Sequence, residues 1–171
     1  GTLNIQTKLD NSAEAVESFA RAIMTTDTHP KWRNARSGHA SLLGVAKGSG
    51  MIEPNMATML SYLVTDAEID HSKLQAMLKK AVDSSFNRIS IDTDTSTSDM
   101  VVLMANGMAG RVNEDEFEKN LIGLCQDLAK DLVRDGEGVT KLIELKISGA
   151  DSPQMAQKIG KSIINSPLIK T

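Results

Sequence analysis

The stretch Lys47-Gly48-Ser49-Gly50-Met51-Ile52-Glu53-Pro54-Asn55-Met56-Ala57-Thr58-Met59-Leu60 contains the most unusual feature of the chain, the pair Ala57-Thr58. A glycine-rich segment that includes a proline leads to a small residue, a hydroxyl residue and then an apolar run. Glycine and the fixed φ of proline permit backbone conformations that other residues avoid. A threonine hydroxyl can attack the carbonyl just before it only where the backbone is held in such a conformation. The order of residues therefore allows self-cleavage between Ala57 and Thr58.

Cleavage at this bond would give Thr58 a free α-amine beside its own hydroxyl, so that one residue holds both a nucleophile and a base. An α-amine has an unperturbed pKa of roughly 7.7–8.0 and is partly neutral near pH 7. The spacing alone favours a simpler interpretation, in which a buried strand follows a glycine-rich loop and Thr58 faces solvent. The rest of the sequence has to decide between the two.

The length and composition predict a single globular domain that is large enough to bury a hydrophobic core. The chain has 171 residues and a net charge of −3, with Lys and Arg scattered along it. This distribution argues against a nucleic-acid surface or a polybasic membrane patch. No apolar run approaches the ~18 residues of a spanning helix. The single cysteine, Cys125, fits a reducing compartment and lies on the apolar side of a predicted helix, so we expect a packed thiol in a cytoplasmic protein.

Helical and strand patterns alternate along the chain, which predicts a layered α/β domain. Helices are expected after four capping positions, namely Asn11, Asp70 or Ser72, Asn113, and Ser152 followed by Pro153. The strands are expected at residues 39–46, 58–65, 88–92, 100–105 and 140–147, and the second of these is apolar on both faces and therefore interior.

A run of acidic and hydroxyl residues between two of the expected strands suggests different chemistry. It contains Asp92, Asp94, Ser96 and Asp99. A metal-dependent phosphoryl-transfer loop built on Asp92 and Asp94 is one hypothesis, although no accompanying lysine or acidic motif lies at a suitable distance. A calcium loop is excluded by the missing glycine and bidentate glutamate. A local network of hydrogen-bonded turns explains the run better. The three histidines have no metal-ligand spacing, and we expect no metal site.

Four stretches of the chain, in order, resemble the ornithine acetyltransferase family, the glutamate N-acetyltransferases of arginine biosynthesis. They are residues 22–28 (Ala-Ile-Met-Thr-Thr-Asp-Thr), 47–60, 90–99 (Ser-Ile-Asp-Thr-Asp-Thr-Ser-Thr-Ser-Asp) and 135–138 (Asp-Gly-Glu-Gly). The resemblance extends over nearly the whole chain. The resemblance favours self-cleavage before Thr58 over the buried-strand interpretation, because in this family the corresponding threonine is released by self-cleavage and becomes the catalytic nucleophile.

The resemblance implies a layered α/β sandwich of the N-terminal-nucleophile-like type, incomplete at both ends. Residues 1–57 resemble the end of the family's alpha chain and residues 58–171 the start of its beta chain. The family's oxyanion-hole residues would precede Gly1, and we therefore expect the 171 residues alone to be inactive. The remaining parts of both chains are the implied partners, in a heterotetramer of two alpha and two beta chains. No nucleic acid or membrane is implied.

The resemblance also implies an activity, in which Thr58 takes acetyl from N-acetylornithine and passes it to glutamate. Thr58 itself counts among the substrate-binding positions, and Thr25, Lys47 and Glu137 match the others, with Lys47 and Glu137 holding charged ends of the substrate. Each has a simpler explanation: a helix-exit threonine, a solvated loop lysine and a glutamate in a helix-terminating turn. No cofactor is implied, while acetyl-CoA stays open as an acetyl donor. The alternative within the family is a paralogue with another acyl donor or acceptor.

Overall fold

The computed structural model describes residues 9–50, 59–93 and 98–170, and the junction Ala57-Thr58 lies outside them, as do Asp94 and Ser96. In order, its elements are α1 (Ala13–Ala22), β1 (Lys31–Ser37), β2 (Ala40–Lys47), β3 (Leu60–Glu68), α2 (His71–Ser84), η2 (Phe86–Arg88), β4 (Met100–Arg111), α3 (Glu114–Arg134), α4 (Pro153–Ile164) and α5 (Pro167–Lys170). The predicted α/β class is confirmed. None of the helices in the described ranges is long and apolar enough to cross a membrane.

The sheet has the strand order β1-β2-β3-β4. The first two pairings are antiparallel, and β3 and β4 are parallel because the connection between them includes α2. Strand β3 has a neighbour on each side, as its apolar pattern predicts. Strand β1 was not predicted, because residues 31–37 are mostly polar and the strand lies at an edge of the sheet.

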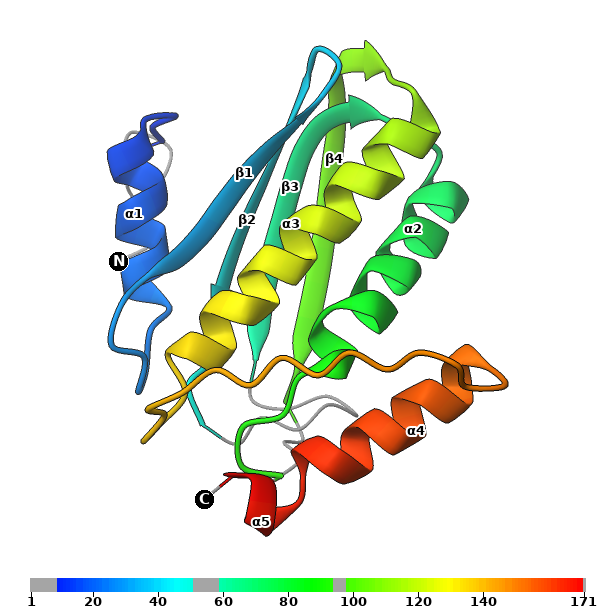
Figure 1. Ribbon diagram of the computed structural model, residues 1–171. Coiled ribbons are helices and arrows are strands. Elements are labelled where there is room, and N and C mark those ends of the chain that lie inside the picture. Colours follow the sequence, from blue (N-terminus) through cyan, green and yellow to red (C-terminus); the bar gives the residue numbers. More distant parts are fainter. Residues whose placement is uncertain (1–8, 51–58, 94–97, 171) are drawn as a thin grey trace.

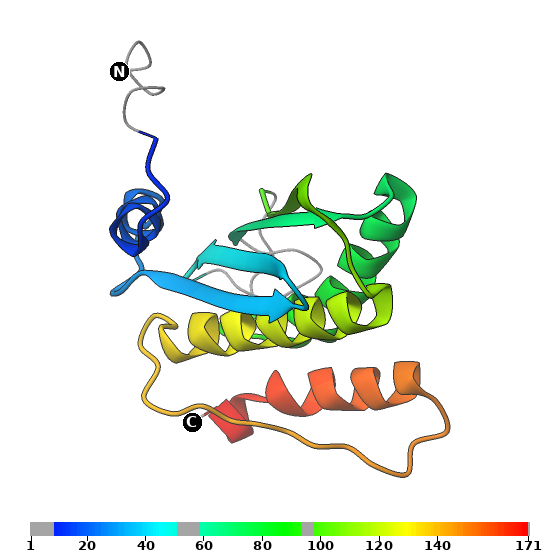
Figure 2. The ribbon, with the colours of Figure 1, turned by 90° about the horizontal axis from the view of Figure 1, so that it is seen from above.

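Helices α2 and α3 cover one face of the sheet, and α3 runs along β1 and β2 (Figures 1 and 2). The core lies between them: Leu42 and Leu63 from the strands are buried together with Leu121 and Leu128 from α3. The long apolar stripe after Asn113 predicts this packing, and Asn113 accepts a hydrogen bond from the amide of Glu116 as an N-cap. Cys125 is fully buried in the same core.

Two of the predicted strands do not form. Residues 88–92 begin at the end of the short helix η2 and continue without regular structure, and residues 140–147 have no strand pairing. The second segment passes on the side of α3 that faces away from the sheet (Figure 2), beyond the reach of any described strand edge. Alternating side chains make a strand only where a neighbouring backbone supplies hydrogen bonds. The cap of α1 is also one residue later than predicted, since Ser12, not Asn11, accepts from the amide of Ala15.

The close approach of α3 to the sheet depends on Gly44 in β2. A Cβ atom at this position would lie 2.6 Å from Leu124 and 2.7 Å from Leu128 on α3, and 2.8 Å from Leu63 on β3. These distances are shorter than any ordinary carbon contact. The helix can therefore lie at its observed distance only because residue 44 has no side chain.

We predict that Gly44→Ala lowers the free energy of unfolding by about 1–3 kcal/mol, because the added methyl group overpacks the contact between α3 and the sheet. Gly123→Ala is the matched control. A Cβ at Gly123 of α3 meets nothing within 4 Å, and alanine favours a helix over glycine by about 1 kcal/mol. Urea unfolding of both variants checks the opposite signs. An unchanged midpoint for Gly44→Ala would contradict the packing argument.

Candidate active site

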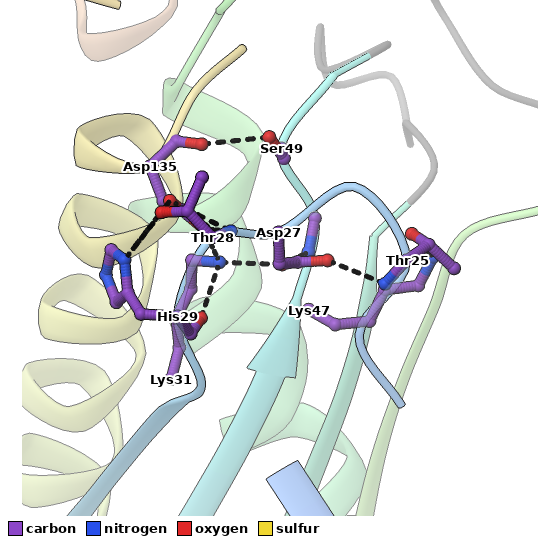
Figure 3. A network of polar contacts seen from close by, with 9 residues as sticks. Thr25, Asp27, Thr28, His29, Lys31, Lys47, Ser49 and Asp135 are labelled. Atoms are coloured by element: carbon purple, nitrogen blue, oxygen red, sulfur yellow. Dashed lines mark hydrogen bonds and ion pairs between the residues drawn. The ribbon is translucent and has the colours of Figure 1, made fainter. Parts of the chain in front are cut away.

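Lys47 is the last residue of β2, and its side chain reaches toward the loop that follows α1. In the sheet Lys47 pairs with Leu60, and Leu60 pairs in turn with Met100. Lys47 is only 6% exposed, and its ammonium group donates to the hydroxyl of Thr25 over 3.3 Å (Figure 3). The structure thus brings together two of the three predicted substrate-binding residues within its described part. A solvated loop lysine, the simpler explanation for Lys47, does not fit this burial.

Glu137, the third of these residues, follows the end of α3 and lies beside the glycine loop. Its backbone amide donates to the carbonyl of Ser49 over 2.7 Å, and Gly138 has a φ of +72°, which lets the chain turn sharply. A Cβ at Gly50 would lie 2.7 Å from a carboxylate oxygen of Glu137 and 3.8 Å from one of Asp92. The absent side chain at Gly50 therefore leaves room for both carboxylates next to the loop.

A buried ammonium group fixes this arrangement. Lys31 donates to Asp27 over 2.6 Å and also to Asp135, and the side chains of Lys31 and Asp27 are wholly removed from solvent (Figure 3). The side chain of Asp135 is also almost completely buried. Lys31 was not identified from the sequence, because a lone lysine at the start of a polar strand has no distinctive pattern.

The two carboxylates connect Lys31 to the loops that carry the predicted site residues. Asp27 accepts from the amide of Gly48 over 2.7 Å and from the amide of Thr25 over 3.2 Å. The carbonyl of Asp135 accepts from the hydroxyl of Ser49 over 2.9 Å. Asp27 and Asp135 both lie within the motifs quoted above, so the motifs could have signalled them, although not their common partner.

The electrostatics of this network keep both carboxylates ionised. Burial alone would raise the pKa of Asp27 and of Asp135, but hydrogen bonds from Lys31 and from neighbouring N–H and O–H groups hold both pKa values below the ordinary value.

Cys125 in the core of the sheet and α3 has a raised pKa instead, because burial raises the pKa of the thiol to about 12. Cys125 is therefore a packed thiol, as predicted, and not a nucleophile.

The acidic run after η2 contributes two residues, Asp92 and Asp99, to the same end of the sheet. Asp99 accepts a hydrogen bond over 2.6 Å from the amide of Met59, a residue 40 positions away in the sequence, so this contact is a tertiary one and not part of a local turn. Asp92 lies beside Gly50. Within residues 9–50, 59–93 and 98–170, no group of three or more His, Cys, Asp or Glu side chains is placed to hold a metal ion.

The described residues define an α/β domain with a charged site around the loop at residues 48–50. The ammonium group of Lys47, the residue before this loop, contacts the hydroxyl of Thr25, and the carboxylates of Glu137 and Asp92 lie beside Gly50. A small molecule with both a negative and a positive end is the ligand that this combination fits.

Comparison with known proteins identifies the family. The sequence model of the ArgJ family matches residues 2–171. A Clostridium acetobutylicum protein named arginine biosynthesis bifunctional protein ArgJ 2 is 59% identical over 154 residues, which is 90% of this chain and 40% of the relative. Glutamate N-acetyltransferase Oat2 of Streptomyces clavuligerus is 51% identical over 152 residues, 89% of this chain and 39% of the relative.

A solved structure agrees with these sequence matches. The crystal structure of the arginine biosynthesis bifunctional protein ArgJ from Bacillus halodurans is similar with a TM-score of 0.59 and 47% identity, over 62% of this chain and 53% of that chain. The chain belongs to the ArgJ family, and the resemblance stated from its motifs is confirmed. It spans about 40% of the length of the curated relatives that it matches.

We predict that Lys31→Met lowers the free energy of unfolding by about 3–5 kcal/mol, because it leaves two buried carboxylates without their ammonium partner. Lys73→Met is the matched control. Lys73 pairs with Glu114 on the surface, with side chains 50% and 43% exposed, and its loss should cost about 0–1 kcal/mol. Urea unfolding at neutral pH measures both. Equal losses for the two variants would contradict the importance assigned to Lys31.

The same network predicts how stability depends on pH. Because the pKa values of Asp27 and Asp135 are lowered in the folded state, their contribution is fully present above the unfolded pKa of about 3.9. This contribution of Asp27 and Asp135 to stability is lost as the pH falls through the pKa values that the two groups have in the folded state. Lys31→Met removes the largest of the interactions that lower both pKa values, so acid unfolding of this variant should begin at a higher pH. Circular dichroism during acid titration measures the two midpoints, which should differ.

Proposed function

We propose that the complete protein to which this chain belongs is a glutamate N-acetyltransferase of arginine biosynthesis, which moves acetyl from N-acetylornithine to glutamate. The observation that carries the proposal is the contact of Lys47 with Thr25 together with the position of Glu137 beside Gly50, directly before the segment that leads to Ala57-Thr58. Two relatives support it by name, one as an arginine-biosynthesis protein and one as a glutamate N-acetyltransferase.

In this proposal the bond between Ala57 and Thr58 is cleaved by the chain itself, and Thr58 then acts as a covalent nucleophile. Its hydroxyl attacks the acetyl carbonyl of N-acetylornithine, ornithine leaves, and glutamate takes the acetyl group from the acetyl-threonine intermediate. The new α-amine of Thr58 carries the proton between these groups. Residues 1–57 then belong to the alpha chain and residues 58–171 to the beta chain.

The charged side chains of the site have separate tasks in the proposal. The ammonium group of Lys47, with the hydroxyl of Thr25 beside it, binds a substrate carboxylate. The carboxylate of Glu137 binds a substrate ammonium group from the other side of Gly50. Both contacts hold the substrate while the reaction occurs at Thr58, which is how positioning lowers the barrier of a group transfer.

The surroundings of the reaction are also part of the proposal. We place the enzyme in the cytoplasm, as a heterotetramer of two alpha and two beta chains. It needs no cofactor in this proposal, and acetyl-CoA is a second acetyl donor to be tested. The phosphoryl-transfer alternative at Asp92 and Asp94 is not favoured, because the relatives are named for arginine biosynthesis. A paralogue with another acyl acceptor would be recognised by kinetics with a panel of amino acids.

We predict that Thr58→Ala, made in the complete protein, abolishes both cleavage and acetyl transfer, because it removes the attacking oxygen of each step. The loss of a covalent nucleophile costs about 10⁶-fold in turnover. Intact-mass measurement follows cleavage, and release of ornithine follows transfer. Thr58→Ser keeps the hydroxyl and should retain both reactions. Normal cleavage of Thr58→Ala at the same bond would refute the proposed nucleophile.

We predict that Glu137→Gln leaves cleavage intact and lowers kcat/KM for N-acetylornithine roughly 10- to 100-fold, because the substrate ammonium loses a charged hydrogen-bond partner. Glu144→Gln is the control, since Glu144 is an exposed glutamate farther along the same irregular segment. Steady-state kinetics of both variants provide the measurement. Unchanged constants for Glu137→Gln would return this residue to a purely structural role in the turn.

A further inference from the structure

The loop at residues 48–50 has a single side chain, that of Ser49, because a glycine stands on each side of it. Ser49 is buried, with 2% of its surface exposed. Its hydroxyl donates to the backbone carbonyl of Asp135 over 2.9 Å (Figure 3). Its own carbonyl accepts from the amide of Glu137 over 2.7 Å. One buried residue of the loop thus makes two hydrogen bonds, of opposite direction, to the turn that follows α3.

The first of these bonds ends on a residue that is itself fixed. The carboxylate of Asp135 binds the buried ammonium group of Lys31 and also accepts from the amide of Thr28 over 3.0 Å. The backbone of Asp135 cannot move far without breaking these buried contacts, and breaking a buried ion pair is costly. The hydroxyl of Ser49 therefore attaches the glycine loop to a fixed point at the end of α3.

The second bond holds the backbone of Glu137, whose side chain is exposed and is therefore not held by packing. The hydrogen bond within the turn, from the amide of Val139 to the carbonyl of Gly136 over 3.0 Å, spans Glu137 without binding it. The carbonyl of Ser49 binds the Glu137 amide, and the carboxylate then lies where a Cβ at Gly50 would be 2.7 Å away from it. The place of this carboxylate thus depends on the place of the Ser49 carbonyl.

The chain from Lys47 to Ser49 is short. Two residues span at most about 7 Å, so the Cα atoms of Lys47 and Ser49 lie within that distance of each other. The ammonium group of Lys47, which donates to the hydroxyl of Thr25, is therefore connected to Glu137 through a loop of very few bonds. Glycine gives this loop little stiffness of its own. The two hydrogen bonds of Ser49 supply the restraint that the loop's own backbone lacks.

We propose that Ser49 is a positioning residue for Glu137, which sets the separation between the carboxylate of Glu137 and the ammonium group of Lys47. The separation selects substrates whose two charged ends match it. In chemical terms the matched substrate is an N-acetyl amino acid with a free carboxylate and a side-chain ammonium group. This inference rests on the proposed function, and in it Ser49 does not touch the substrate but acts through Glu137.

The test uses Ser49→Ala in the complete protein with two acetyl donors. One is N-acetylornithine, and the other is N-acetylnorvaline, which has the same carbon chain without the side-chain ammonium group. We expect kcat/KM for N-acetylornithine to fall roughly 5- to 50-fold, through a higher KM, because the partner of the ammonium group is displaced. The value for N-acetylnorvaline should stay unchanged, since this donor offers Glu137 nothing to bind. General damage to the fold would lower both values alike.

A double-mutant cycle shows whether Ser49 acts through Glu137. In the Glu137→Gln background the charged partner of the ammonium group is already lost, so the further change Ser49→Ala should alter kcat/KM for N-acetylornithine by less than about 3-fold. Two residues that act separately would instead give losses that multiply.

Thr65→Val is the matched control. Thr65 is 7% exposed, and its hydroxyl donates over 2.7 Å to the carbonyl of Ser41, which is also distant in sequence. Thr65 lies near the β1–β2 hairpin, at the opposite end of the pairing between β2 and β3 from Lys47 (Figure 1). Its thermal midpoint should fall about as far as that of Ser49→Ala, because each variant loses one buried hydroxyl. Its kinetic constants for both donors should equal those of the wild type.

All kinetic constants refer to the cleaved fraction, which intact-mass measurement gives. If Ser49→Ala is not cleaved, the two chains are coexpressed from separate genes, the second beginning Met-Thr58, so that removal of the initiator methionine exposes Thr58. The kinetic comparison is then made on this assembled protein, with the wild type and the control variant prepared in the same way.

The outcomes separate this inference from the proposed function. If the wild type transfers no acetyl, or if Glu137→Gln keeps the wild-type constants, the proposed roles fail and the inference fails with them. If both behave as proposed but Ser49→Ala lowers kcat/KM for the two donors alike, or its loss multiplies with that of Glu137→Gln, the inference alone is overturned. A loss that is confined to N-acetylornithine and absent in the Glu137→Gln background supports it.

Discussion

The ammonium group of Lys31 lies between the carboxylates of Asp27 and Asp135, and the whole group is buried. Each carboxylate also binds or adjoins a loop of the site: Asp27 binds the amide of Gly48, and the backbone of Asp135 binds Ser49. Two buried negative charges could not be kept so close without the positive charge between them. The shape of the site around residues 48–50 depends on this one interaction.

The sheet and α3 supply the frame in which that interaction forms. Because Gly44 lets α3 lie directly on β2, the end of the helix comes to the end of that strand, and Asp135 comes to Lys31. The same contact places Glu137 over the glycine loop. Tightly packed strands and the helix α3 thus fix the backbone positions of the functional residues. A fixed backbone keeps the proposed substrate-binding side chains in one arrangement, which a preorganised site requires.

Several parts of the fold were predictable because the responsible forces are local. The caps at Asn113 and Ser152 use hydrogen bonds to amides three residues away, and the stripe of α3 repeats with the helical period. Strand β1 and residues 140–147 were predicted wrongly for the converse reason. A segment becomes a strand only if it pairs with another strand, which can be far away in the sequence. The polarity and alternation of its own side chains do not indicate whether such a partner is present.

The sequence by itself determined the family, the α/β class and the candidate residues Thr25, Lys47 and Glu137, because motifs of adjacent residues carry this information. The structure brought Lys47 to Thr25 and placed Glu137 beside Gly50, and it alone identified Lys31 as the partner of both Asp27 and Asp135 and Asp99 as the partner of Met59. Lys31 and Asp135 are more than a hundred residues apart in sequence. Their attraction becomes strong only when the folded chain removes both from water, and that depends on packing across the whole domain.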